Sequence, residues 1–155
     1  MKSQAIAPMP VDPQWLRSFV VKDGVLLGGL SEPQRRAALA LAWAAVPAVD
    51  AFSEAQINTA LKQQLEEGAL MCLGIDHVEL RRWLVDCAFV SRDGFGRRYL
   101  VTPLHALPPL SRVAAEWVIG TLADMPAAAW GQDLRRAHED QRALRRARHA
   151  AGQAA

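Results

Sequence analysis

Arginines in two neighbouring stretches are the residues of this chain best suited to chemistry on a partner. Arg81 and Arg82 lie in the run Leu80–Asp86, and three more arginines follow at positions 92, 97 and 98. Guanidinium groups bind phosphate oxygens and, in the major groove of DNA, the edge of guanine. The two stretches therefore indicate a candidate surface for nucleic acid.

Acidic residues lie among these arginines, so a second interpretation stays open. Asp86 follows Arg82 by four residues, which is the spacing of an ion pair on a helix. Glu79 precedes both arginines of the first stretch, and Asp93 lies among those of the second. The first two arginines either contact DNA or form internal salt bridges. The later three either contact DNA or belong to an ordinary solvated hairpin.

The residue types used in catalysis and metal binding form no usable pattern. The histidines, at positions 77, 105, 138 and 149, have no metal-ligand spacing with one another or with Cys72 and Cys87. Ser53, Asp76 and His77 could be combined as a triad, but Ser53 and Asp76 stand where helix caps are needed. We therefore predict a protein that is not an enzyme and that has no metal and no cofactor.

Three predicted helices begin with the same arrangement of residues. A serine or aspartate stands at the cap, and a glutamine or glutamate follows three residues later, so that each side chain can bond to the other residue's backbone N–H. Phe52 and Ile57 flank the second start as an apolar pair, and Ile75 and Leu80 flank the third. The predicted helices begin at Ser31, Ser53 and Asp76, and they end near residues 47, 68 and 88.

A hairpin is predicted directly after the third of these helices. Phe89–Arg92 and Arg97–Thr102 are rich in β-prone residues, and the glycine-bearing segment Asp93–Gly96 separates them. Phe95 at the tip either touches a partner or packs onto the body. The remaining expected elements are a short helix after Asp12-Pro13, a short strand at Val25–Leu27, a helix capped by Ser111 that ends near Ala123, and a long helix over Ala127–Ala151.

The order of helix, helix, helix and hairpin is that of a winged helix-turn-helix. We therefore predict a mainly α fold with a small β-hairpin, in the form of a winged helix-turn-helix-like domain plus C-terminal helices. Residues 1–11 are expected to form a flexible arm, 12–103 the domain, and 104–155 a helical extension that dimerises or is partly disordered.

The third helix would be the one that enters the major groove. At about 100° per residue, Leu80, Trp83, Leu84 and Cys87 fall on one buried face. The outer face mixes valines with charges of both signs, whereas a groove-reading helix usually carries more polar side chains. This mixture favours an alternative function, a protein-interaction module that has the same fold and binds no DNA.

Three segments resemble a known bacterial family. The segments are FVVKDGVLLGGLSEPQRR, FSEAQINTAL and DHVELRRWLVDCAFVSRDGFGRRYLV, and LRRWLVD within the third is the most specific. They are similar to the family catalogued as domain of unknown function two-thousand-and-eighty-seven, over about Phe19 to Thr102. The resemblance implies a winged-helix-like domain, found alone or appended to ArsR-type regulators, with a role near transcription and no demonstrated activity. The connection over 65–74 is longer than is usual in that family, and the helix from Ser111 onward lies outside the resemblance.

Composition limits the partners only weakly. Eighteen basic and 16 acidic residues leave a net charge of +2, which does not by itself indicate nucleic acid. From Gly131 onward, six arginines face three acids, so the basic excess lies in the tail. We interpret the two cysteines as reduced packing residues, and no segment has the length and composition of a membrane span or a signal peptide. The expected compartment is therefore the cytoplasm.

The expected partners are double-stranded DNA, with a second copy of the chain or another protein as alternatives, and no membrane. The DNA-contact candidates are His77, Val78, Arg81, Arg82, Val85, Arg92, Phe95, Arg97 and Arg98. Candidates in the tail for phosphate or dimer contacts are Arg135, Arg142, Arg145 and Arg146.

Overall fold

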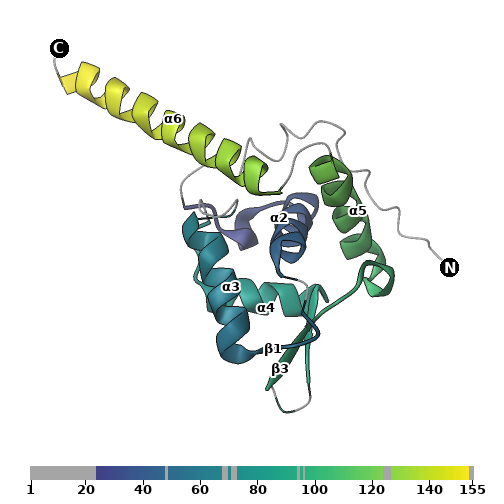
Figure 1. The fold of residues 1–155 in the computed structure, drawn as a ribbon. Coiled ribbons are helices and arrows are strands. Elements are labelled where there is room, and N and C mark those ends of the chain that lie inside the picture. Colours follow the sequence, from purple (N-terminus) through teal and green to yellow (C-terminus); the bar gives the residue numbers. More distant parts are fainter. Residues whose placement is uncertain are drawn as a thin grey trace.

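A computed structural model describes residues 24–47, 49–67, 70, 73–93, 95, 97–123 and 127–153. The arm over 1–11, the helix after Asp12-Pro13 and Cys72 lie outside these residues. Figure 1 shows the arrangement of the elements. In chain order they are η1 (Leu27–Gly29), α2 (Glu32–Ala45), β1 (Phe52–Ser53), α3 (Glu54–Glu67), α4 (His77–Asp86), β2 (Val90–Arg92), β3 (Arg98–Val101), η2 (Leu104–Ala106), α5 (Pro109–Ala123) and α6 (Ala127–Gln153).

The predicted fold class is confirmed, because helices dominate and the strands form one small antiparallel sheet. The strand order is β1-β3-β2, so the predicted hairpin of β2 and β3 gains a third strand that the sequence did not indicate. β1 is only two residues long, and it pairs Phe52 with Tyr99 and Ser53 with Arg98. Helix α2, strand β1, helices α3 and α4, and the hairpin of β2 and β3 follow one another along the chain.

The helix starts at Ser31, Ser53 and Asp76 are confirmed. The Ser31 hydroxyl accepts the N–H of Gln34, and the Gln34 side chain accepts the N–H of Ser31. Ser53 and Gln56 form the same reciprocal pair at 3.1 and 2.8 Å. At the third start, Asp76 accepts the N–H of Glu79 at 2.8 Å. Each such cap stabilises its helix by about 1 kcal/mol, so α2, α3 and α4 begin at well-defined residues.

The segment before α2 corrects one expectation. Val25 makes a single β-bridge, to Leu73, and the chain then turns into η1 instead of continuing as the predicted strand Val25–Leu27. Arg35 explains part of this, because its guanidinium donates to the backbone carbonyls of Leu27 and Leu30, both at 2.9 Å. Those carbonyls are bound by a side chain of α2, and only a single residue is left in strand pairing.

Two glycines allow this segment to approach the connection between α3 and α4. The N–H of Gly74 donates to the carbonyl of Val25 at 2.8 Å. A Cβ atom at Gly74 would lie 3.0 Å from the Cα of Gly24. Gly24 itself has a φ of 66°, in the left-handed region that glycine adopts without strain. Leu70 and Leu73 are buried, so the connection between α3 and α4 contributes to the core.

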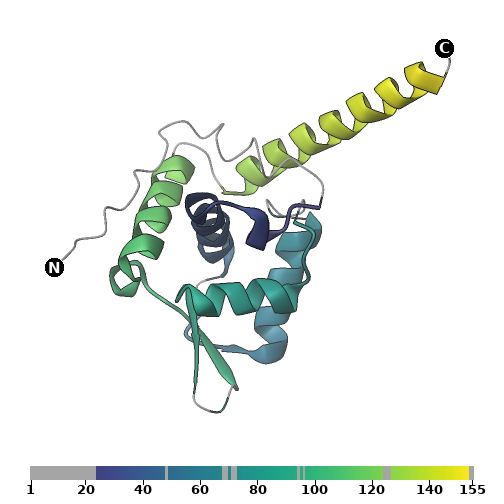
Figure 2. The same ribbon diagram turned by 180° about the vertical axis from the view of Figure 1, so that it is seen from behind.

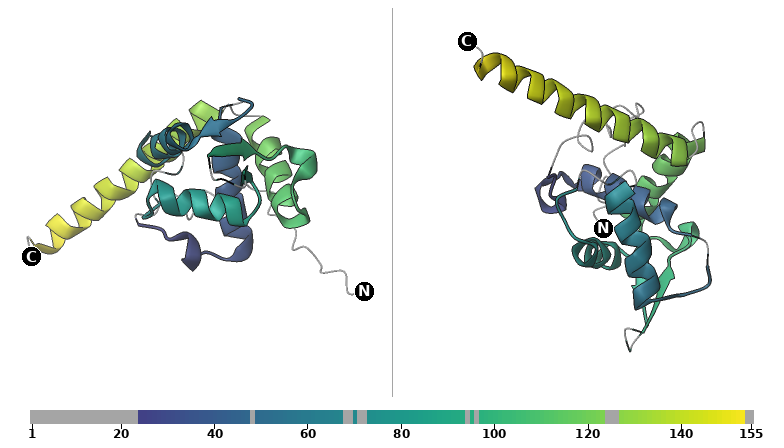
Figure 3. Two further views of the ribbon diagram at one scale, coloured as in Figure 1. Left: turned by 90° about the horizontal axis from the view of Figure 1, so that it is seen from below. Right: turned by 60° about the vertical axis from the view of Figure 1, so that its left-hand side comes forward.

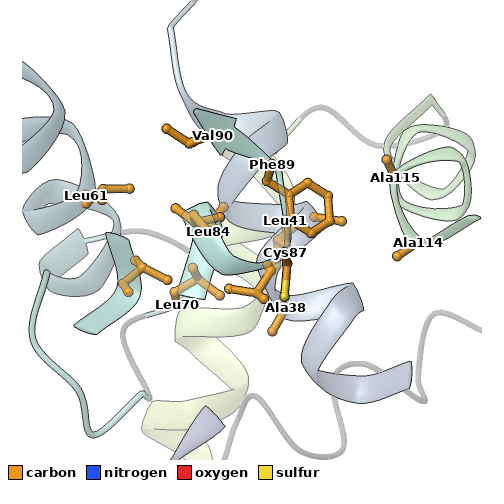
Figure 4. Packing of buried hydrophobic residues seen from close by; sticks show 14 of the residues in the cluster. Ala38, Leu41, Leu61, Leu70, Leu84, Cys87, Phe89, Val90, Ala114 and Ala115 are labelled. Carbon is orange, nitrogen blue, oxygen red and sulfur yellow. The ribbon is translucent and has the colours of Figure 1, made fainter. Parts of the chain in front are cut away.

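Helix α2 is the centre of the hydrophobic core. Its residues 37–42 are all buried, which requires neighbours around most of the helix surface. The helix packs most extensively against α5 and also contacts α3 and α4. Figure 4 shows Ala114 and Ala115 of α5 on one side of this cluster and Leu61 of α3 on the other.

The start of α5 corrects a second expectation. The helix begins at Pro109, which is suited to a first helical position, and Ser111 lies in its first turn instead of capping it. Ser111 is fully buried. Its hydroxyl donates to the carbonyl of Cys87 at 2.7 Å and accepts a hydrogen bond from Arg36 at 2.6 Å. Ser111 thus connects α5 to α2 and to the end of α4.

Helix α4 ends in a Schellman motif whose left-handed residue is not a glycine. Ala88 has a φ of 62°. The N–H of Phe89 donates to the carbonyl of Leu84 at 2.9 Å, and the N–H of Ala88 to that of Val85 at 3.0 Å. These are the two bonds that define the motif. The motif turns the chain from α4 directly into β2, so it sets where the hairpin stands relative to the helix.

Helix α6 confirms the predicted long helix at the end of the chain. Figures 1 and 2 show it leaving the body at the end opposite to the hairpin, and both views in Figure 3 show it extending beyond the other elements. All of its residues from 142 to 152 are exposed. None of the described helices is long and apolar enough to span a membrane.

Candidate nucleic-acid interface

The predicted buried face of helix α4 is confirmed. Leu80 and Leu84 are fully buried, Cys87 is nearly so, and Trp83 packs partly buried against the core. The Trp83 ring is covered by the guanidinium of Arg35, which lies 4.9 Å from its centroid. The outer face therefore carries Val78, Arg82 and Asp86, all exposed, beside the half-buried Val85.

Arg81 is turned inward and held by three groups. Its guanidinium donates to the side-chain oxygen of Asn58, and it lies 3.4 Å from a carboxylate oxygen of Glu54. It also stacks over the Tyr99 ring, at 5.3 Å from the centroid. Only 15% of the Arg81 side chain is exposed. Arg81 thus forms an internal salt bridge, and the residue joins α4 to α3 and β3.

Arg82 differs from Arg81 in its exposure and in its pairing. Its side chain is exposed, and no carboxylate of the described residues lies within salt-bridge distance of it. The ion pair that the spacing of Arg82 and Asp86 suggested is therefore not formed. Residues adjacent on a helix point about 100° apart, so inward and outward arginines can follow one another directly.

A pocket of about 250 Å³ lies between the outer face of α4 and the sheet. It brings together residues that are as much as 21 positions apart in the chain, and Figure 2 shows α4 lying directly above the hairpin. The lining residues are Val78, Arg81, Arg82, Val85, Asp86, Arg92 and Tyr99. Five of the nine predicted DNA-contact residues thus converge on one site.

The sheet register separates the hairpin arginines. Arg92 pairs directly with Tyr99, so the two side chains lie on the face of the sheet that meets α4. Arg98 precedes Tyr99 and pairs with Ser53, so its side chain lies on the opposite face, together with that of Leu100. Arg97 is exposed at the turn. Arg92 is therefore the hairpin arginine that faces the pocket.

The turn of the hairpin is organised by Asp93. Its carboxylate accepts the backbone N–H of Arg97 at 2.9 Å and that of Phe95 at 3.2 Å. Phe95 is 86% exposed, so in this structure it does not pack onto the body. Arg97 is exposed at the same turn.

Other predicted residues lie away from the pocket. His77 is the first residue of α4 and is half-buried. Arg142, Arg145 and Arg146 are exposed on α6, and the side chain of Arg135 lies outside the described residues. The sequence did not single out Tyr99 or Glu54, which hold Arg81. Their roles depend on the register of the hairpin and on the contact of α3 with α4. Neither can be read from the sequence, because both arise only when the chain folds.

The Cys87 thiol does not act as a nucleophile in this structure. Burial raises the pKa of the Cys87 thiol, so the group stays protonated and less nucleophilic at neutral pH. Within the part of the chain that the structure describes, no three His, Cys, Asp or Glu residues are grouped so that they could hold a metal ion.

Comparison with known proteins supports the family suggested by the sequence segments. Residues 31–101 match the family described as "Uncharacterized protein conserved in bacteria (DUF2087)", which is the family that the sequence segments resemble. The match runs from the cap of α2 to the end of β3 and so includes the whole pocket. No curated protein and no solved structure matches the chain.

Proposed function

We propose that this protein binds double-stranded DNA through the outer face of α4 and the hairpin, in a role connected with transcription. One observation carries the proposal. The side chains of Arg82 and Arg92 converge from two elements on one open pocket, and neither forms an ion pair with another described residue. Arginines placed in this way are suited to phosphate contacts.

The neighbouring groups favour contacts to the DNA backbone over reading of bases. Arg97 and Arg98 add charge on the hairpin, where the wing of a winged helix meets the backbone or minor groove. The outer face of α4 offers Val78 for apolar contact but also carries Glu79 and Asp86, which repel phosphate. We therefore propose binding dominated by electrostatic contacts, with limited sequence preference.

Titration of a labelled DNA duplex at several salt concentrations tests the proposal. With three or four phosphates contacted, the log–log plot of affinity against salt should have a slope of roughly −3 to −4. Arg82→Gln and Arg92→Gln should each weaken binding, whereas Arg112→Gln on α5 removes the same charge away from the pocket and should not. Absence of binding at low salt, or a slope near zero, contradicts DNA binding.

A second candidate function is contact with a protein partner through the hairpin. Phe95 is 86% exposed and Leu100 is 44% exposed, so the hairpin offers apolar side chains as well as arginines. Such residues contribute to protein interfaces more than to phosphate binding. A Phe95→Ser, Leu100→Ser variant that keeps full DNA affinity would leave these two residues to a protein partner. A variant that loses DNA affinity would assign them to the DNA interface.

A further inference from the structure

We propose that the pocket between α4 and β2 holds a single phosphate group, bound jointly by Arg82 and Arg92. If the phosphate belongs to DNA, this inference rests on the proposed function. It goes further because it assigns one phosphate of the DNA to two named side chains. The same chemistry could come from a free phosphate, and the experiments below separate the two sources.

The arrangement of the two arginines suits a tetrahedral anion. Arg82 lines the pocket from α4 and Arg92 from the end of β2, so the two arginines belong to different walls of the pocket. A planar carboxylate is satisfied by one bidentate arginine. A phosphate has oxygens that point in several directions and can accept from both arginines at once.

The walls of the pocket strengthen such a contact. Val78 and Val85 are apolar, and Tyr99 lies with its ring against the guanidinium of Arg81. A phosphate seated against these walls would displace water from them, which lowers the local dielectric constant and strengthens a charged hydrogen bond. Arg81 also lines the pocket, but its guanidinium already donates to Asn58 and pairs with Glu54.

Asp86 is the one lining residue that opposes an anion. It is exposed and lies one helical turn beyond Arg82, on the rim of the same pocket. Its negative charge lowers the affinity for phosphate, so Asp86→Asn should bind the anion more tightly. Asp86 is also the last residue of α4, where a negative charge is unfavourable to the helix dipole, and the substitution should not weaken the fold.

The first experiment is a double-variant cycle with duplex DNA. Arg82→Gln and Arg92→Gln should each weaken binding about tenfold and make the salt slope less steep by about 1. The double variant should be little weaker than either single variant, because both arginines bind the same group. Arg97→Gln should add fully to Arg82→Gln, since Arg97 lies at the turn. Asp86→Asn should tighten binding several-fold, a gain that a folding defect cannot produce.

The second experiment uses inorganic phosphate in place of DNA. Side-chain NMR signals of Arg82 and Arg92 should shift together on titration, and the shift should be absent in each arginine variant. If phosphate binds in this way and DNA does not, the pocket stands as a site for a free phosphate and the proposed function falls. If DNA binds but the effects of Arg82→Gln and Arg92→Gln add fully, the shared phosphate is overturned and DNA binding stands. If neither ligand binds, both proposals are overturned.

Discussion

Ala88 has a backbone conformation that is unfavourable for a residue with a Cβ atom. Its φ of 62° closes the Schellman motif at the end of α4, a position that glycine usually occupies. An L-residue with a Cβ atom is disfavoured in this region by roughly 1 kcal/mol. The two hydrogen bonds of the motif, which form where α4 leads into the hairpin, offset this unfavourable free energy.

Ala88→Gly should therefore stabilise the protein by up to about 1 kcal/mol, measured as the free energy of unfolding in urea. The strain relieved should exceed the entropy that glycine gives to the unfolded chain. Ala55→Gly, at an exposed position in α3 with ordinary helical geometry, is the matched control and should destabilise by up to about 1 kcal/mol. Equal losses in both variants would show that the conformation of Ala88 carries no strain.

At the residue scale, the sequence predicted the composition of the site but not the role of each side chain. The run Leu80–Asp86 placed two arginines on α4 and predicted its buried face correctly. It could not tell that Arg81 binds Asn58 while Arg82 stays exposed, because that difference depends on where α3 packs. Helical spacing likewise suggested an ion pair of Arg82 with Asp86 that the rotamers do not form.

Among the elements, the approach of the segment at Gly24 to the connection before α4 depends on a missing side chain. A Cβ atom at Gly74 would meet the backbone of Gly24 at 3.0–3.1 Å, and backbone atoms cannot move aside cheaply. We expect Gly74→Ala to destabilise the protein by about 1–3 kcal/mol, the range for overpacking of a close contact.

Thermal and urea unfolding measure this effect, and Gly28→Ala is its control. Gly28 lies in η1, where an added Cβ meets nothing within 4 Å, so its substitution should change stability by less than about 0.5 kcal/mol. If Gly74→Ala proves as harmless as Gly28→Ala, the bridge between Val25 and Leu73 is not needed for the fold.

The elements that the sequence predicted well are those with local signals. The caps at Ser31 and Ser53 form as expected, because a capping box involves only residues three positions apart. β1 was not predicted, since two residues carry no periodicity and their pairing partners lie 45 and 47 positions later. The start of α5 was placed at Ser111 because a serine often caps a helix, whereas here its hydroxyl is needed by Cys87 and Arg36.

In the whole molecule, the buried core extends beyond the segment that matches the family. That match ends at residue 101, yet the core includes Leu107 as well as Ala114, Ala115 and Val118 of α5. These side chains cover α2, which is buried over six consecutive residues. Helix α6, in contrast, contributes no side chain to the described core.

Truncation should separate the two C-terminal helices. A chain that ends at residue 126 should unfold cooperatively with nearly the stability of the full chain, as followed by circular dichroism. A chain that ends at residue 103 uncovers α2 and should lose cooperative unfolding, because several buried apolar side chains are removed together. If the shorter chain folds as stably as the longer one, α5 is a separate addition to a domain that is complete without it.

The bonds of Asp93 across the turn have a consequence for how fast a complex would form. Because the carboxylate already holds the N–H groups of Phe95 and Arg97, these residues need little ordering when a partner arrives. A surface that is organised in advance loses less conformational entropy on docking. The encounter should then be limited by diffusion and accelerated by the nearby positive charge, so that added salt slows association more than it speeds release.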